Sequence, residues 1–214
     1  MSEISLQNSS PTNPTDDSDL EEHSSIVVPK SFLDRAIHSI TEKLASILVN
    51  ITWITPNQIS WLSGGLGGLV AGWFIVRENY LLAVFFIILS GILDCLDGDL
   101  ARARNMASGE GDILDSVIDR YVDFLLIAAL ILVFPNNYLI PGLLALLGTT
   151  LVPYVRARSE AEGKSTVASI GSRSTRTILI IIGLLTQQIL PLLILLAAIT
   201  NIASIHRLIF ALKK

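Results

Sequence analysis

The chain has 214 residues, of which 51% are hydrophobic, and its mean hydropathy is +0.60. These values exclude an ordinary soluble domain and indicate a single membrane domain. The formal net charge of −4 owes much to an acidic head, and the single cysteine, Cys95, excludes an intrachain disulfide.

Residues 1–25 are predicted to form a disordered acidic head, because they are rich in Ser, Asn, Asp and Glu and poor in apolar residues. The head has no basic start, no early apolar core and no small-residue cleavage pattern, so we expect no cleaved secretory signal.

Residues 26–50 are predicted to form a juxtamembrane amphipathic helix. Apolar residues recur at helical spacing between charged ones, at Leu33, Ile37, Ile40, Leu44 and Leu48. A soluble packing helix would show the same pattern. The position directly before the membrane spans favours a helix that lies on the membrane surface.

Residues 51–214 are predicted to form a six-helix membrane domain. Six apolar runs are long enough to cross about 30 Å of hydrocarbon, at 57–76, 80–100, 113–134, 137–155, 175–190 and 191–211. Only Gln187, Gln188 and Pro191 separate the last two. The predicted fold class is an all-α polytopic membrane protein with six transmembrane helices, preceded by an amphipathic interfacial helix.

Basic residues favour one orientation of these spans. Lys and Arg gather before the first span, after the second, between the fourth and fifth, and at the C-terminal end, whereas the opposite loops carry only Arg77. Because cytoplasmic loops are enriched in Lys and Arg, both termini and these loops are predicted to face the cytoplasm of a cell membrane.

Six aspartates interrupt the apolar character around the second and third spans: Asp94, Asp97, Asp99, Asp112, Asp115 and Asp119. Charges in membrane helices are costly and mark function by default. One face of the second helix would carry Asp94, Asp97, Gly98 and Ala101, and one face of the third would carry Gly111, Asp115 and Asp119. Two helices can therefore present two pairs of carboxylates to each other.

These carboxylates predict a divalent metal site formed by Asp94, Asp97, Asp115 and Asp119. Four such groups would repel one another without cations, and hard oxygen ligands suit Mg²⁺ or Mn²⁺. Two ions could bridge a diphosphate and neutralise its charge. A divalent-cation transporter is an alternative, because carboxylates also line ion paths, although these aspartates cluster near one membrane face.

Written out, the stretch reads Asp94-x2-Asp97-Gly98-x2-Ala101-Arg102-x8-Gly111-x3-Asp115-x3-Asp119. It resembles, position for position, the signature of the CDP-alcohol phosphatidyltransferase family. The resemblance implies six membrane helices and transfer of a lipid phosphate from CDP-diacylglycerol or CDP-archaeol to an alcohol, with release of CMP. An intramembrane prenyltransferase shares the metal and diphosphate chemistry but is expected to space its aspartates differently.

The resemblance also implies residue roles. Asp94, Asp97 and Asp115 would be metal ligands, and Asp119 would contribute to the metal site and act as general base. The cytidine diphosphate site would be lined by Gly98, Ala101 and Arg102, where small side chains allow a close approach to the helix backbone. The resemblance suggests that the protein is a homodimer. Its expected partners include membrane lipids and do not include nucleic acid.

Asp99 and Asp112 fit no signature position and are predicted to be solvated charges at helix ends. Asp123 continues the stripe of Asp115 and Asp119, but we expect it to form an ion pair with Arg120 within the helix.

Thr55 and Pro56 predict the start of the first membrane helix. The family often carries a similar Thr-Pro-Asn, and the free N–H groups of a helix start can receive phosphate. Thr55 and Asn57 are therefore further candidates for nucleotide binding, with simple helix capping as the alternative.

Three arginines near the membrane surface, Arg156, Arg173 and Arg176, are predicted to bind the phosphate of a phosphorylated alcohol, because guanidinium groups bind phosphate oxygens bidentately. Topology anchoring is the alternative. The pair three residues apart is similar to the inositol-phosphate branch of the family, the phosphatidylinositol-phosphate and archaetidylinositol-phosphate synthases. Ser172 and Thr175 stand where that branch commonly has glutamates, so glycerol 3-phosphate stays open as the acceptor.

Overall fold

The computed structural model describes residues 32–51, 53–164 and 171–213. The predicted acidic head, and the first residues of the predicted juxtamembrane helix, lie outside these ranges. Every regular element within them is helical, in agreement with the all-α prediction.

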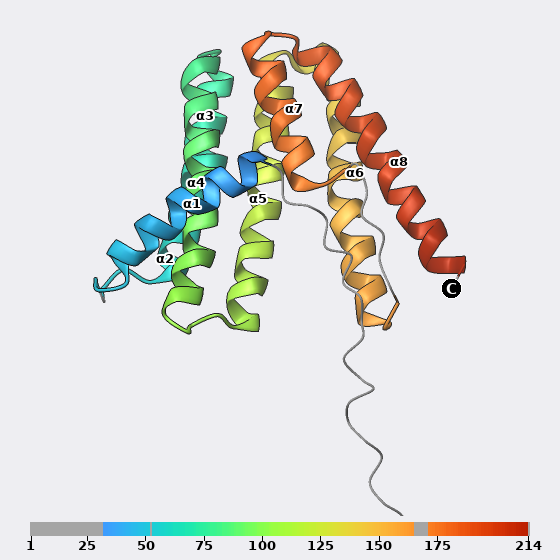
Figure 1. The fold of residues 1–214 in the computed structure, drawn as a ribbon. Coiled ribbons are helices and arrows are strands. Elements are labelled where there is room, and N and C mark those ends of the chain that lie inside the picture. The colour runs from blue at the N-terminus through green and yellow to red at the C-terminus, as the bar shows by residue number, and fades with distance from the viewer. Residues whose placement is uncertain (1–31, 52, 165–170, 214) are drawn as a thin grey trace, which may run out of the picture.

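The described elements are α1 (Phe32–Leu48), α2 (Pro56–Gly64), η2 (Gly65–Val70), α3 (Ala71–Val76), α4 (Tyr80–Ala103), α5 (Gly109–Val133), α6 (Pro135–Ala161), α7 (Arg173–Leu185) and α8 (Ile189–Lys213). The segments α2, η2 and α3 follow one another without a break and form one long helix, in which η2 is a π-helical turn. Most helices run roughly alongside one another, while α1 crosses α4 at a steep angle (Figure 1).

Four of the described helices are long and apolar enough to cross a membrane: Pro56–Val76, Tyr80–Ala103, Pro135–Ala161 and Ile189–Lys213. The other two predicted spans correspond to α5 and α7. The helix α5 has 25 residues but carries several charged side chains, and α7 has only 13 residues.

The first membrane helix begins as the sequence predicts. The Thr55 side chain accepts a hydrogen bond from the backbone N–H of Gln58, and the Gln58 side chain accepts one from the Thr55 N–H at 2.9 Å. This reciprocal pair satisfies two backbone donors at the start of α2. The capping role predicted for Thr55 is therefore confirmed.

The break between α7 and α8 falls a few residues before the predicted boundary at 190 and 191. Gln187 has a positive φ of 58°, and the Gln188 N–H donates to the Gly183 carbonyl at 3.0 Å, which ends α7. Pro191 does not interrupt α8, because it lies in the first turn of the helix, where no backbone donor is needed.

The middle of the first membrane helix, at η2, packs closely against α4 and α5. A Cβ atom at Gly67 would lie 2.3 Å from Ser90 Oγ of α4, and one at Gly68 would lie 2.8 Å from Leu125 Cδ1 of α5. At Gly67 a side chain would force α4 away, because the Cβ of Ser90 would also lie within 2.8 Å, whereas at Gly68 the end of the Leu125 side chain would have to move. A smaller apolar cluster, containing Ala45 of α1 and Leu100 of α4, packs α1 against the same bundle.

Candidate functional site

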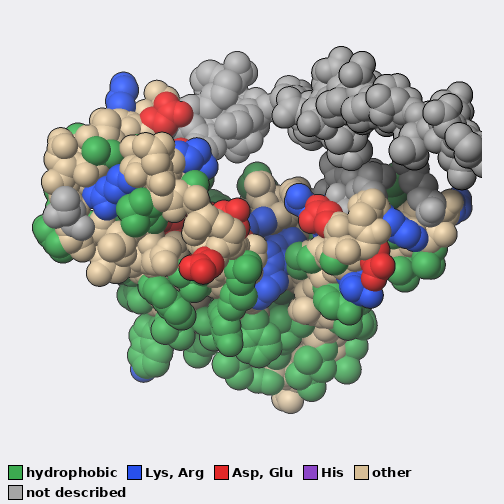
Figure 2. Space-filling model, turned by 90° about the horizontal axis from the view of Figure 1, so that it is seen from below, with side chains coloured by type: hydrophobic (Ala, Val, Ile, Leu, Met, Phe, Trp, Pro, Cys, Tyr) green, Lys and Arg blue, Asp and Glu red, His purple; other side chains and the backbone are tan. Residues whose placement is uncertain are grey.

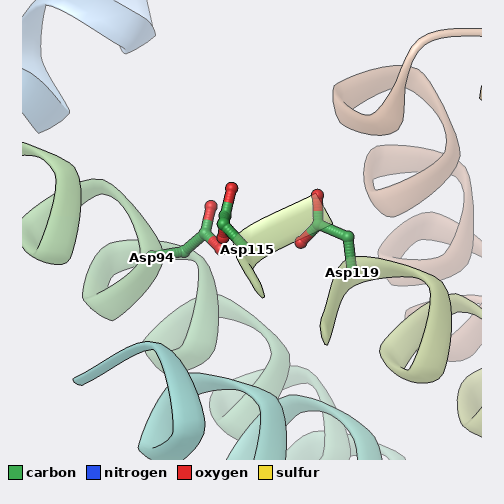
Figure 3. Close-up of side chains that lie close together, drawn as sticks. All are labelled: Asp94, Asp115 and Asp119. Carbon is green, nitrogen blue, oxygen red and sulfur yellow. The ribbon is translucent and has the colours of Figure 1, made fainter. Parts of the chain in front are cut away.

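Three aspartates from α4 and α5 converge near the cytoplasmic ends predicted for these helices. Asp94, Asp115 and Asp119 each offer a carboxylate oxygen within 4.8 Å of the others, and Figure 3 shows Asp94 and Asp115 side by side with Asp119 facing them. The Oδ1 atom of Asp115 is buried without a hydrogen-bond partner among the described residues. Such a donor set fits a hard divalent cation.

Asp97, the fourth predicted ligand, is not in this group. Its carboxylate is buried and accepts a hydrogen bond from the Ser60 hydroxyl of α2. It nevertheless lines the same pocket as Asp115. The structure thus brings three of the four predicted metal ligands together and holds the fourth beside them.

This pocket has a volume of about 320 Å³ and lies between the start of α2, the end of α4 and the start of α5. Its lining includes all five residues predicted to bind the nucleotide, Thr55, Asn57, Gly98, Ala101 and Arg102. Asp97, Asp112 and Asp115 also line the pocket, and because Asp115 belongs to the carboxylate cluster, the pocket lies directly beside that cluster.

Arg102, on the pocket wall, is bound by Asp99, a residue whose surroundings differ from the prediction. Arg102 Nη2 donates to Asp99 Oδ1 at 2.5 Å, and a Cβ atom at Gly98 would lie 3.5 Å from Arg102 Nη1. Asp99 also accepts a hydrogen bond from Thr41 of α1 and is buried. The prediction that Asp99 is solvated is therefore wrong, because α1 covers that side of α4. Asp112 is exposed, as predicted.

The three predicted acceptor arginines lie in different surroundings. Arg173 donates to Asp94 Oδ2 at 2.6 Å and lies 2.7 Å from Asp119 Oδ1, so it is the one that meets the carboxylate cluster. Arg156 is exposed and pairs with Glu160 of its own helix at 2.8 Å. Seen from below, the molecule has a hollow between two parts, with basic side chains in the hollow and acidic side chains along its sides (Figure 2).

Arg176 is buried, and its guanidinium is paired within the protein. Its guanidinium donates to Asp123 Oδ2 at 2.6 Å and to the Gly171 carbonyl at 2.8 Å. Asp123 also lies 3.8 Å from Arg120, so the ion pair predicted within α5 is present but is longer than the one with α7.

Sequence reasoning missed two residues that build the site. Ser60 bonds Asp97, as described above. Arg104 donates to the carbonyls of Leu48, Ile51 and Ile54, at 2.5, 2.8 and 2.5 Å, and so fastens the connection from α1 to the pocket-lining start of α2. The available signal was a second basic residue two positions after Arg102, within the signature, but its partners are backbone atoms that no sequence pattern reveals.

A family model described as CDP-alcohol phosphatidyltransferase matches residues 53–211. The chain is 33% identical to the archaetidylinositol phosphate synthase of Pyrococcus horikoshii over 174 residues, which are 81% of this chain and 91% of that protein. Crystal structures of Mycobacterium tuberculosis phosphatidylinositol phosphate synthase share the fold at 22% identity and a TM-score of 0.75. One, with CDP-DAG bound, covers 81% of this chain and 94% of that chain. Another, in complex with manganese and citrate, covers 80% and 88%.

Proposed function

Because the chain belongs to the CDP-alcohol phosphatidyltransferase family, we propose that this integral membrane enzyme transfers a lipid phosphate from a CDP-activated lipid to inositol phosphate and releases CMP. The observation that carries the proposal is the carboxylate cluster, which has a nucleotide-sized pocket on one side and Arg173 on the other. The lipid donor is CDP-diacylglycerol or CDP-archaeol.

The metal is held by Asp94, Asp97, Asp115 and Asp119 in this proposal, as two ions of Mg²⁺ or Mn²⁺. The oxygens of three of these residues within 4.8 Å, and the buried Asp115 oxygen without a partner among the described residues, support this assignment. Bound ions would neutralise negative charge on the transferred phosphate and on the leaving CMP. Ser60 orients Asp97 by its hydrogen bond.

The cytidine diphosphate group occupies the pocket of about 320 Å³. Gly98 and Ala101 leave its floor open, since neither carries a side chain longer than a methyl group. Arg102 supplies positive charge at the wall. At the start of α2, Thr55 lines the pocket and the backbone N–H of Asn57 can donate to a phosphate oxygen.

Asp119 is the general base. The acceptor hydroxyl oxygen forms a bond to the lipid-bearing phosphorus, the bond from that phosphorus to the CMP oxygen breaks, and the hydroxyl proton passes to the Asp119 carboxylate. The Arg173 guanidinium, 2.7 Å from Asp119, fixes the carboxylate in place.

The acceptor phosphate binds on the arginine side of the cluster. Arg173 is only partly buried and opens α7 beside Asp94 and Asp119, so a phosphate bound to it would bring the acceptor hydroxyl close to the base. Arg156 is exposed on α6 and adds a second cation. The archaetidylinositol phosphate synthase relative supports inositol phosphate over glycerol 3-phosphate as the acceptor.

The membrane arrangement belongs to the same proposal. Six transmembrane helices cross a cell membrane with both termini and the site in the cytoplasm, α5 and α7 completing the set, and the protein is a homodimer. Residues 51–214 form this domain, 26–50 the interfacial helix and 1–25 an acidic head. Exposed Ile40, Leu44 and Ile47 give α1 an apolar face, while Thr41 and Ala45 pack inward.

The test is an acceptor panel with purified protein and CDP-activated lipid. Inositol phosphate, glycerol 3-phosphate, inositol, serine and ethanolamine are compared by CMP release. Inositol phosphate should give the highest kcat/KM, and CMP release with none of the five would contradict the proposal. Mn²⁺ uptake into proteoliposomes, measured in parallel, separates the enzyme from the alternative of a cation transporter.

A further inference from the structure

Two arginines of α7 face two aspartates of α5 in register. Arg173 and Arg176 are three residues apart, and Asp119 and Asp123 are four apart, so each pair shares one helix face. Arg173 Nη2 lies 2.7 Å from Asp119 Oδ1, and Arg176 Nη2 lies 2.6 Å from Asp123 Oδ2. These ion pairs form a ladder, with Arg173–Asp119 as its outer rung and Arg176–Asp123 as its inner rung.

The two rungs differ in their access to solvent. The side chain of Arg173 is 31% exposed and that of Arg176 is 3% exposed. To bind a substrate phosphate, Arg176 would have to leave Asp123, which would keep only the longer contact of 3.8 Å to Arg120, and losing the close partner of a buried carboxylate is unfavourable. The inner rung is therefore a fixed contact, whereas the outer rung is partly open to solvent, where a substrate can reach it.

The inner rung also fixes the place where α7 begins. Arg176 Nη1 donates to the Gly171 carbonyl at 2.8 Å, just before Ser172 caps the helix. Gly171 in turn lies tightly against α8, since a Cβ atom there would be 2.9 Å from the Cβ of Ala203. One buried guanidinium thus connects α5 to the first turn of α7 at the point where α7 meets α8.

We propose that Asp123 and Arg176 are positioning residues, which set the register of α7 on α5 so that Arg173 reaches Asp119 and the acceptor phosphate. The inference rests on the proposed function, in which Arg173 binds that phosphate. Arg176 acts through Arg173 and does not touch the substrate.

The first experiment measures CMP release by the full chain in nanodiscs at varied inositol phosphate. Asp123→Asn should raise the KM for inositol phosphate about tenfold. Without the ion pair to Arg176, the first turn of α7 no longer holds Arg173 in place beside Asp119. The KM for CDP-activated lipid should not change. The charge-reversed double variant, Asp123→Arg with Arg176→Asp, should recover most of the lost affinity for the acceptor.

A second double variant separates positioning from stability. Asp123→Leu with Arg176→Met replaces the buried pair by apolar side chains, a change that often preserves or raises stability. If the pair positions α7, this double variant should have a higher KM for inositol phosphate while its melting temperature does not fall. The control is Leu184→Ala in the buried part of α7, which should lower the melting temperature and leave the acceptor KM unchanged. A normal acceptor KM in the apolar double variant would overturn the inference.

Hydrogen exchange tests the ladder without any substrate. In Asp123→Asn the amides of residues 173–177 should exchange faster than in the wild type, because the first turn of α7 loses its link to α5. If the wild type releases no CMP with any acceptor, the proposed function fails and the exchange result still decides on the ladder. Unchanged exchange in this variant would overturn the positioning role.

Discussion

The two sides of the site are built from equally regular patterns but are used differently. On the aspartate side, residues of α4 and α5 direct three carboxylates to one point. On the arginine side, α7 carries Arg173 and Arg176 at helical spacing, yet one faces the cluster and the other is buried against Asp123. Spacing assigns residues to a helix face, but the packing of that face decides whether a charge serves a ligand or the fold.

The largest effect should follow from removing a charge on the aspartate side. Asp115→Asn should lower kcat/KM by about a thousandfold or more with every acceptor, because several kcal/mol of charge stabilisation are lost. Titration with Mn²⁺ should show weaker metal binding. Glu110→Gln removes an exposed charge from the same helix and is the control. Equal activity of the two variants at saturating Mn²⁺, or full activity of Asp115→Asn in the presence of a chelator, would break the comparison.

The arginine side should respond selectively. Arg173→Ala should lower kcat/KM for phosphorylated acceptors by about ten- to a hundredfold, since a charge-assisted contact contributes roughly 1.5 to 3 kcal/mol. Any activity with phosphate-free inositol should fall less. Arg158→Ala is the matched control, because Arg158 is exposed and pairs with Glu162 at the end of α6. Equal losses with both acceptors would mean that Arg173 serves the carboxylates alone.

The nucleotide pocket belongs to the aspartate side and should respond to bulk. Gly98→Leu should weaken binding of CDP-activated lipid about tenfold or more, because the longer side chain would enter the pocket and meet Arg102. Gly98→Ala is the control, since its Cβ would lie 3.5 Å from Arg102 Nη1, an ordinary contact. The affinity of each variant is measured by the binding of labelled CDP-activated lipid in nanodiscs. Loss in the alanine variant as well would indicate a backbone effect.

The sequence predicts the aspartate side well, because both helices begin at local signals and their charges repeat at helical spacing. Asn79 caps α4 and Ser108 caps α5, each by accepting a hydrogen bond from the backbone N–H three residues later. Asp99 and Arg176 could not be placed, because their partners Thr41 and Asp123 lie 58 and 53 residues away along the chain. Contacts between residues so far apart depend on how the helices pack, and local patterns in one sequence do not reveal them.

The smallest effect should come from the hydroxyl that orients Asp97. Ser60→Ala removes a hydrogen bond to this carboxylate but no charge, and a typical hydrogen bond contributes about 1 kcal/mol. The Mn²⁺ concentration for half-maximal CMP release should rise about fivefold, with kcat at saturating metal nearly unchanged. Ser63→Ala is the matched control one turn later, because Ser63 donates to the Ser90 carbonyl at 3.0 Å instead of to a carboxylate. An equal rise of this Mn²⁺ concentration in both variants would show that the two serines act through helix packing. A rise in Ser60→Ala alone would support Asp97 as a metal-binding carboxylate.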